Sequence, residues 1–431
     1  MQRGCRPRIV RGAMTSRAMR GRVCAMRARS GRREQLLDLA AKQLNARGMS
    51  QRSLATLAAS LGFTRNALYR YVEDFEDLLG QVYRRSCELL SERLSEAMAP
   101  TSPLLIVQRF VSLALDGERP EIAALNEYGL LHPQDRTDVI DMYLAVEARL
   151  ARVISHGLKS GELRSCDPQL AARTIINLIH WAPLGARRGL LVDASERELA
   201  IETINGLLLV GWAADRQAPI APPEIDLSPL IVQITDGFDQ AALHEVKRET
   251  ILACASRMFN SRGVETTSLD HLAAELGTTK PRLYKYVGDK TALVEACFAR
   301  ADKINRHILQ AARELPCAPM DKLTALLRTS TAIRLNGPLE PMRYFLAGAP
   351  NPEIEPLRSR RRLLRMVENN TQLFRECQDA GAVRRFDVQG LQLINMTGGG
   401  GIIRHGDRPS VAAKGAAAEM VELLRLGLSP L

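Results

Sequence analysis

The sequence GVETTSLDHLAAELGTTKPRLYKYVGDKTAL, residues 263–293, decides the fold, and a second version of it, GMSQRSLATLAASLGFTRNALYRYVEDFEDL, occupies residues 48–78. The two versions belong to a gapless alignment of Arg33–Leu79 with Arg248–Val294, so every matched pair is separated by the same distance along the chain. Self-similarity at a fixed offset indicates a duplicated structural unit. The identical positions include Gly48 and Gly263, Ser53 and Ser268, Leu57 and Leu272, Gly62 and Gly277, and Tyr69 and Tyr284.

Each copy predicts three short helices. In the first helix, apolar residues recur every fourth position and give one buried stripe. These residues are Leu36, Ala40 and Leu44 in one copy and Ile251, Ala255 and Phe259 in the other. Glycine ends this helix, serine caps the second helix, a second glycine makes a tight turn, and threonine caps the third helix. In chain order these are Gly48, Ser53, Gly62 and Thr64, and Gly263, Ser268, Gly277 and Thr279.

The third helix has a basic and aromatic outer face. Leu68 and Leu283 are expected to face the core. A short helix, a glycine turn and a helix with such a face is the arrangement that inserts a recognition helix into the major groove of DNA. A solvated surface is the alternative, yet the face occurs twice at the same offset. It comprises Arg65, Asn66, Tyr69 and Arg70 in the first copy, and Lys280, Pro281, Tyr284 and Lys285, with Arg282 nearby, in the second.

The order of these residues resembles the DNA-binding domain of the tetracycline-repressor (TetR/AcrR) family. The second copy follows the family pattern almost continuously, and the specific part covers the whole aligned stretch in each half. The resemblance implies an all-α dimeric repressor whose larger C-terminal domain binds a small molecule and thereby changes the spacing of two recognition helices. The residues that carry it in the second copy are Gly263, Ser268, Leu269, Leu272, Ala273, Gly277, Thr279, Lys280, Leu283, Tyr284, Tyr286, Asp289, Lys290 and Leu293.

The same resemblance implies which residues touch DNA. Expected phosphate contacts are Thr64, Tyr69, Tyr71, Thr279, Tyr284, Tyr286 and Lys290, and the capping Ser53 and Ser268 are included in the DNA-binding set. Arg65, Asn66, Arg70, Lys280, Pro281, Arg282 and Lys285 are expected to face base edges. An arginine that pairs with guanine discriminates by roughly 1–3 kcal/mol.

Two departures from the family pattern distinguish the copies. Val72 and Val287 stand where the family usually has Phe, which predicts looser packing behind the recognition helix. The first copy has Phe75 in place of Lys290, within the acidic run of residues 73–77, which would repel phosphates. We therefore expect the second copy to be the stronger DNA reader.

Length and composition predict an all-α protein of two domains. The repeat and the family resemblance imply two tandem units, each with a three-helix DNA-binding domain followed by a helical regulatory bundle. Four prolines between residues 214 and 243 indicate a linker, and residues 161–167 resemble residues 381–387 downstream of each copy. The predicted organisation is a tail at 1–31, helix-turn-helix domains at 32–80 and 244–295, regulatory domains at 81–213 and 296–431, and a linker at 214–243.

The net charge of +11 comes from the tail, because residues 1–33 hold 11 arginines and no acidic residue. This tail is expected either to bind phosphates or a minor groove, or to be disordered. Later start sites at Met14, Met19 and Met26, or a transit peptide, are further alternatives. Neither a membrane helix nor a secretory signal is expected, and the eight scattered cysteines predict reduced thiols in a cytoplasmic protein.

The regulatory halves carry no recognisable catalytic chemistry. Aromatic residues in these bundles are more often plain core, and the alternative is that they line an effector pocket in a helical bundle. The candidate lining residues are Phe110, Tyr128, Tyr143, Trp181, Tyr344, Phe345 and Phe374. The glycine run at 398–401 lacks the context of a phosphate loop, and the histidines lack ligand spacing, so no cofactor and no metal are expected.

The leading hypothesis is a ligand-responsive repressor that binds a double-stranded DNA operator and a small-molecule effector. Its two units would pair within one chain, or chains would pair as homodimers. The main alternative is a helical ligand-binding protein with weak or sequence-independent DNA binding. An enzyme is the least supported class.

Overall fold

The computed structural model describes residues 31–46, 53–62, 64–99, 101–125, 128–184, 194–232, 238–264, 266–335, 339–343, 355–386 and 413–431. Within these residues every regular element is a helix, and an isolated β-bridge joins Ala213 to Val383. The prediction of an all-α fold is confirmed. No helix among the described residues is long and apolar enough to cross a membrane.

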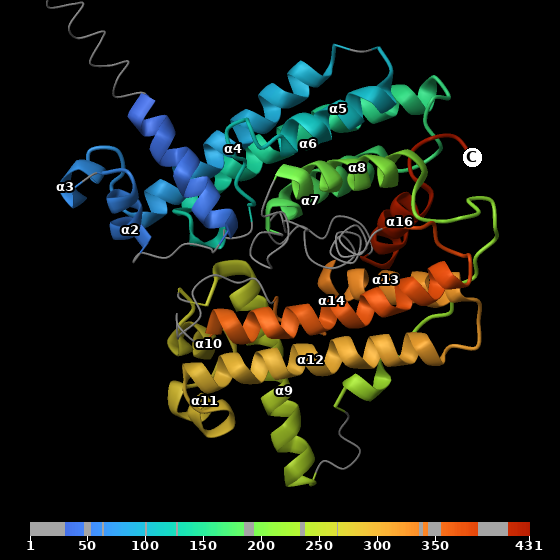
Figure 1. Ribbon diagram of the computed structural model, residues 1–431. Helices are drawn as coiled ribbons and strands as arrows, with labels where there is room; N and C mark the ends of the chain where they lie inside the picture. The colour runs from blue at the N-terminus through green and yellow to red at the C-terminus, as the bar shows by residue number, and fades with distance from the viewer. Residues whose placement is uncertain are drawn as a thin grey trace, which may run out of the picture.

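The first half begins with a helix-turn-helix unit and continues as a helical bundle (Figure 1). Aspartate or serine side chains cap three of the bundle helices by accepting hydrogen bonds from backbone N–H groups of the first turn. A helix over 31–46 precedes α2 (Ser53–Ser60), α3 (Arg65–Leu68), α4 (Phe75–Ala97), α5 (Pro103–Leu115), the 3-10 turn η1 (Tyr128–Leu130), α6 (Pro133–Lys159), α7 (Pro168–Trp181) and α8 (Ala194–Val210).

The described residues of the second half follow a similar order, after a connection that is free of α-helix from residue 211 to residue 232 and contains the 3-10 turn η3 (Ser228–Leu230). The Asp239 side chain caps the next helix, which begins at Gln240, inside the predicted linker of 214–243. The helices are α9 (Gln240–Arg262), α10 (Leu269–Glu275), α11 (Lys280–Val287), α12 (Lys290–Glu314), α13 (Pro319–Leu335), α14 (Glu355–Asp379) and α16 (Ala413–Leu426).

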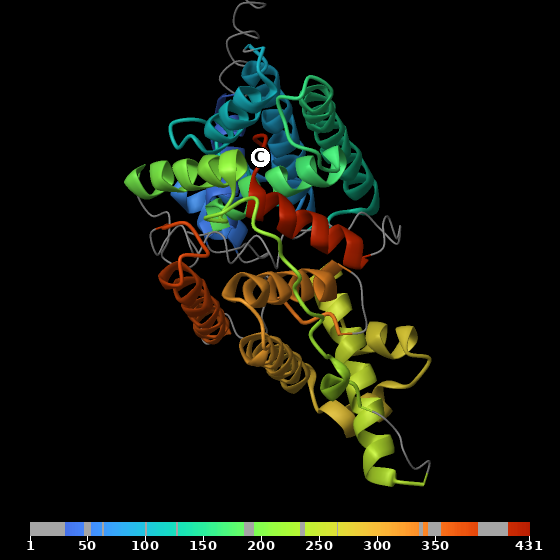
Figure 2. The ribbon, with the colours of Figure 1, turned by 90° about the vertical axis from the view of Figure 1, so that its right-hand side faces the viewer.

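The C-terminal ends of α8 and α16 cross and exchange backbone hydrogen bonds in matching pairs (Figure 2). Every residue of the exchange in the first half is matched by one in the second half at a single constant offset. Trp212 N donates to Leu424 O at 3.1 Å and Leu428 N to Leu208 O at 2.7 Å, while Ala213 N donates to Arg425 O and Ser429 N to Leu209 O, each at 3.0 Å. A contact of i with j that is repeated as j with i is the property of an isologous, two-fold interface.

Glycine makes this crossing possible. Gly211 and Gly427 end α8 and α16 with φ of 68° and 69°. A Cβ on Gly211 would lie 2.1 Å from Arg425 O, and one on Gly427 would lie 2.6 Å from Leu209 O. Both positions therefore require glycine for the same two reasons, a left-handed backbone and a close approach of the other helix.

The segments 161–167 and 381–387 also take part in this crossing. Gly161 and Gly381 follow α6 and α14 with φ of 73° and 71°. Further along each segment, Arg164 N donates to Leu428 O and Arg384 N donates to Trp212 O, both at 2.8 Å. The similarity seen between these segments in the sequence thus corresponds to equivalent contacts between the halves.

The apolar core is shared unequally between the two helix-turn-helix units. One large cluster runs from Leu36 in the first unit through both bundles to Leu428. The second unit has a separate cluster, which includes Ile251, Leu283 and the N-terminal part of α12, with Met342. The first unit is therefore continuous with the main core, whereas the second forms a core of its own.

Candidate nucleic-acid interface

The second unit has a complete recognition helix. Ser268 caps α10 in a capping box with His271, Gly277 makes the turn with φ 60°, and Thr279 precedes α11. Leu283 and Val287 of α11 are buried, so the opposite face is turned outward. Exposed on it, as predicted, are Pro281, Arg282, Lys285 and Tyr284, the last with 46% of its surface accessible.

Two of the predicted DNA contacts in this unit already have partners within the protein. Lys280 Nζ lies 2.9 Å from Asp270 Oδ2, and this hydrogen bond raises the pKa of Lys280. The Tyr286 ring packs against His244, with ring centroids 4.7 Å apart. Contact of Lys280 with a base edge would therefore replace an existing ion pair and would gain less than a contact made by an unpaired lysine.

The first unit has a recognition helix of only four residues. The Thr64 hydroxyl accepts a hydrogen bond from Ala67 N at 3.2 Å, which starts α3 as expected. After Leu68 the chain continues as a turn, in which Tyr71 N donates to Leu68 O at 2.9 Å. Asn66, Tyr69 and Arg70 are exposed, and Tyr71 is half-buried, whereas the side chains of Ser53 and Arg65 lie outside the described residues.

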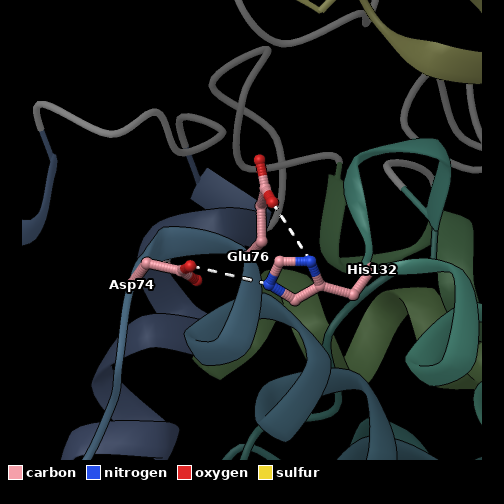
Figure 3. Close-up of side chains that lie close together, drawn as sticks. All are labelled: Asp74, Glu76 and His132. Carbon is pink, nitrogen blue, oxygen red and sulfur yellow. Dashed lines mark ion pairs between the residues drawn. The ribbon is translucent and has the colours of Figure 1, made fainter.

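An ion-pair cluster lies beside the shorter recognition helix, at the start of α4 (Figure 3). His132 Nε2 is 3.5 Å from Asp74 Oδ2, and His132 Nδ1 is 3.4 Å from Glu76 Oε2. Sequence spacing gave no sign of this grouping, because His132 is far along the chain from both carboxylates. Each ring nitrogen faces a different carboxylate, so the cluster makes a polar contact between the start of α4 and the start of α6.

The same buried polar network holds each helix-turn-helix unit to its bundle. Asn45 Nδ2 donates to Glu121 Oε1 at 2.8 Å, and Asn260 Nδ2 donates to Glu340 Oε1 at 2.8 Å. An arginine of the fourth helix donates to the backbone carbonyl of the same glutamate and pairs with a glutamate of the first helix. These are Arg85 with Glu121 and Glu34, and Arg300 with Glu340 and Glu249.

Asn45 and Asn260 are equivalent positions within the aligned stretch, but the other residues of this network lie partly outside it. Arg85 and Arg300 keep the offset of the repeat just beyond the aligned stretch, while Glu121 and Glu340 are slightly further apart than that offset. An alignment that tolerated this small shift would have found the glutamates. The network is the second duplicated feature, and its asparagine, its arginine and the glutamate that accepts from the asparagine are buried in both copies.

The predicted pocket residues do not gather in one place. Phe110 and Tyr143 lie in the main core, and Trp181 belongs to a small cluster with Ala124 and Leu184. The ring centroids of Phe374 and of Trp212 in the first half are 5.9 Å apart. Phe374 therefore packs at the junction of the halves. Tyr344, Phe345, the side chain of Tyr128 and the glycine run at 398–401 lie outside the described residues.

The helix α7 of the first bundle buries polar side chains on one face. Asn177 and His180 are 6% and 5% exposed, and within the described part of the chain neither the Asn177 amide nor His180 Nε2 has a hydrogen-bond partner. The Tyr143 ring lies beside His180, with centroids 5.8 Å apart. Burial lowers the pKa of His180 to about 4, so its imidazole is neutral near pH 7.

Comparison with known protein families gives matches in both halves. The model of bacterial regulatory proteins of the tetR family matches residues 251–297, and the model of the tetracyclin repressor-like C-terminal domain matches residues 105–184. The chain belongs to the TetR family. It is a transcriptional regulator with the DNA-binding and ligand-binding domains of that family, and the resemblance found in the sequence is confirmed. The N-terminal domain model matches in the second half, after the C-terminal domain model has matched in the first.

Individual relatives of this TetR-family chain are distant. The uncharacterized HTH-type transcriptional regulator YhgD of Bacillus subtilis (strain 168) is 19% identical over 160 residues, which cover 34% of this chain and 80% of YhgD. Among solved structures, AibR in complex with isovaleryl coenzyme A and operator DNA is 20% identical with a TM-score of 0.35, covering 41% of this chain and 97% of AibR. The regulator PfmR from Thermus thermophilus is 21% identical with a TM-score of 0.33, covering 40% of this chain and 92% of PfmR.

Proposed function

We propose that this TetR-family regulator is a ligand-responsive repressor whose two helix-turn-helix units pair within one chain and read an imperfect palindrome. The observation that carries the proposal is the reciprocal exchange of hydrogen bonds between the ends of α8 and α16. A contact of this kind normally relates two identical subunits. Here both partners belong to one polypeptide, which makes the chain a pseudo-dimer.

The order of the family matches supports a tandem arrangement. A C-terminal domain match at 105–184 precedes an N-terminal domain match at 251–297, so the N-terminal domain that belongs with the first match must come before residue 105. Residues 33–79 hold the first copy of the repeat at that place. The order of the matches and the place of this copy support two family units in series.

The placement of the two units supports DNA reading by both. In Figure 1, α3 and α11 lie on the same side of the molecule, as two recognition helices that approach one duplex would. Their outer faces differ, with Asn66 and Arg70 against Pro281 and Lys285. Unlike faces favour unlike half-sites, and hence an imperfect palindrome.

The polar face of α7 supports effector binding by the first bundle. A buried amide and imidazole without partners cost free energy, which a ligand offsets when it supplies hydrogen bonds. The Asn177 amide and the neutral His180 imidazole offer hydrogen-bond donors and acceptors. Aromatic residues are present on the same two helices, with Tyr143 on α6 and Trp181 on α7. We assign the effector site to this face, with Phe110 in the surrounding core, and assign no catalytic step to the chain.

Selection of bound DNA from a random pool at physiological salt tests the proposal, with the full chain and with residues 32–431 in parallel. An enriched asymmetric motif with two half-sites centred about ten base pairs apart, obtained with both proteins, is the expected result. No enrichment with either protein would instead favour a helical ligand-binding protein. Binding that needs residues 1–31 and selects no motif would favour sequence-independent coating of DNA.

A further inference from the structure

The segment between α5 and α6 touches both DNA-binding units. Its first part holds the helix over 31–46: Asn45 Nδ2 donates to Ile122 O at 2.8 Å, and Ala124 N donates to Asn45 Oδ1 at 2.9 Å. Its second part, Gly129 and Leu130 of η1, lies against the C-terminal end of α9 in the second unit. We call residues 121–124 and 129–130 the brace.

The contact of the brace with the second unit leaves no room for a side chain. A Cβ on Gly129 would lie 1.7 Å from Ser261 O and 2.6 Å from Arg262 Cα. Gly129 does not have a positive φ, so the close approach alone requires glycine there. Next to it, the Leu130 side chain lies 3.1 Å from where a Cβ of Gly263 would be, at the residue that ends α9.

Both ends of the brace are held by the first bundle. Arg136 of α6 donates to Gly129 O at 2.9 Å and to Leu131 O at 3.1 Å. At the other end Ser86 of α4 accepts from Ala123 N at 3.0 Å, and Glu121 N donates to Asp38 in the first unit at 2.7 Å. The brace is therefore fixed to one unit and to the bundle, and it abuts the other unit.

We propose that the brace sets the distance between the two recognition helices and that Gly129 is a residue that determines half-site spacing. The inference rests on the proposed function, because spacing has meaning only if both units read one duplex. Half-site spacing follows from the separation of two recognition helices that are rigidly connected. A side chain at position 129 must push α9 away from η1 and so change that separation.

The test compares full-length wild-type protein with the Gly129→Ala variant on duplexes that carry the selected half-sites. The spacer varies from two base pairs shorter to two longer than the selected one. Wild-type protein is expected to prefer one spacer, and Gly129→Ala is expected to lose about tenfold in affinity at that spacer and to prefer a neighbouring one. Gly206→Ala in α8 is the matched control, because its added methyl group meets nothing within 4 Å. It should keep the wild-type profile.

The outcomes separate this inference from the proposed function. A wild-type protein with no spacer preference would overturn the proposed function and the brace with it. A sharp wild-type profile that Gly129→Ala reproduces would overturn the brace alone. If Gly129→Ala does not fold, Leu130→Ala decides the question: loss of the contact with Gly263 should flatten the profile, and an unchanged profile would refute the inference.

Discussion

The two helix-turn-helix units agree in their interior and differ on their DNA-facing side. Both bury an asparagine, an arginine and one glutamate in the same network, and in both the arginine pairs with a more exposed glutamate of the first helix. Yet α11 is an eight-residue helix and α3 has four residues. The fourth helix starts at Phe75 between Asp74 and Glu76 in the first unit, and at Lys290 after Asp289 in the second. Contacts that hold a unit to its bundle are thus separable from contacts that meet DNA.

The units also differ in how they join the rest of the protein. The first shares the main core, while the second has its own core, and α12 contributes to both clusters. The second unit is therefore expected to be the stronger reader and the more independent body. Four experiments, taken from the largest expected effect to the smallest, test this contrast.

Substitution of the buried arginines should give the largest effect. Arg300→Met removes the buried guanidinium that pairs with Glu249 and donates to the Glu340 backbone carbonyl, and should cost about 3–5 kcal/mol of unfolding free energy. Arg85→Met should cost less, because its partner Glu34 is exposed. Urea denaturation with hydrogen exchange measures both losses. For Arg300→Met, hydrogen exchange should rise in α9–α11. For Arg85→Met, it should rise in the first unit and also in α5–α8, because these share one core. Exposed Arg306→Met is the control, and an Arg300→Met variant as stable as this control would refute the role of the network.

Acidification should destabilise the first bundle through His180. Its folded pKa of about 4 lies below the ordinary value of 6.5, so the unfolded chain takes up a proton first as the pH falls. The free energy of unfolding therefore keeps its full value above pH 6.5 and decreases by about 3 kcal/mol as the pH falls toward 4. His180→Leu should remove this part of the pH dependence of unfolding. Parallel pH profiles for both proteins would show that His180 does not titrate as described.

Truncation of the recognition residues should affect DNA binding unequally. Tyr284→Ala and Lys285→Ala are each expected to weaken operator binding by about 10-fold or more, corresponding to roughly 1–3 kcal/mol. Tyr69→Ala and Arg70→Ala should have smaller effects, because they follow the short α3 beside the acidic start of α4. Fluorescence anisotropy measures all four variants. A larger loss for Arg70→Ala than for Lys285→Ala would reverse the predicted order of the two units.

Reversal of charge at the start of α4 should give the smallest effect. Glu76 follows Phe75, which is the residue equivalent to Lys290 of the second unit. Glu76→Lys replaces a negative charge with a positive one beside that position, and should strengthen DNA binding by about 2- to 5-fold at low salt. The slope of log affinity against log salt should steepen by about 1. Glu314→Lys, with the same charge change at the far end of α12, is the control. Equal effects of the two variants would mean that only net charge matters.

Much of the second unit could be predicted from its sequence because local rules decide it. Gly263 and Gly277 take the positive φ that their places after α9 and α10 suggest, and Ser268 caps α10 as expected. Val72 and Val287, predicted behind the recognition helices, are both buried. Apolar periodicity, helix capping and turn formation depend on residues that are only a few positions apart, and the repeat shows each of these signals twice.

The remaining features depend on contacts between distant segments. The early end of α3 was not predicted, since residues 69–71 match the helical residues 284–286 in two tyrosines. His132 meets Asp74 and Glu76 only because α6 begins beside α4. The exchange between α8 and α16 joins backbone groups from opposite halves of the chain, which no local pattern encodes.

The stoichiometry of the complex with DNA tests the central claim most directly. Native mass spectrometry of the full chain on its selected duplex, at a concentration just above the dissociation constant, counts the chains bound to each DNA molecule. Pairing within one chain predicts a single chain per duplex, with both half-sites protected in footprints of the same sample. Two chains per duplex, with one half-site protected by each, would contradict it.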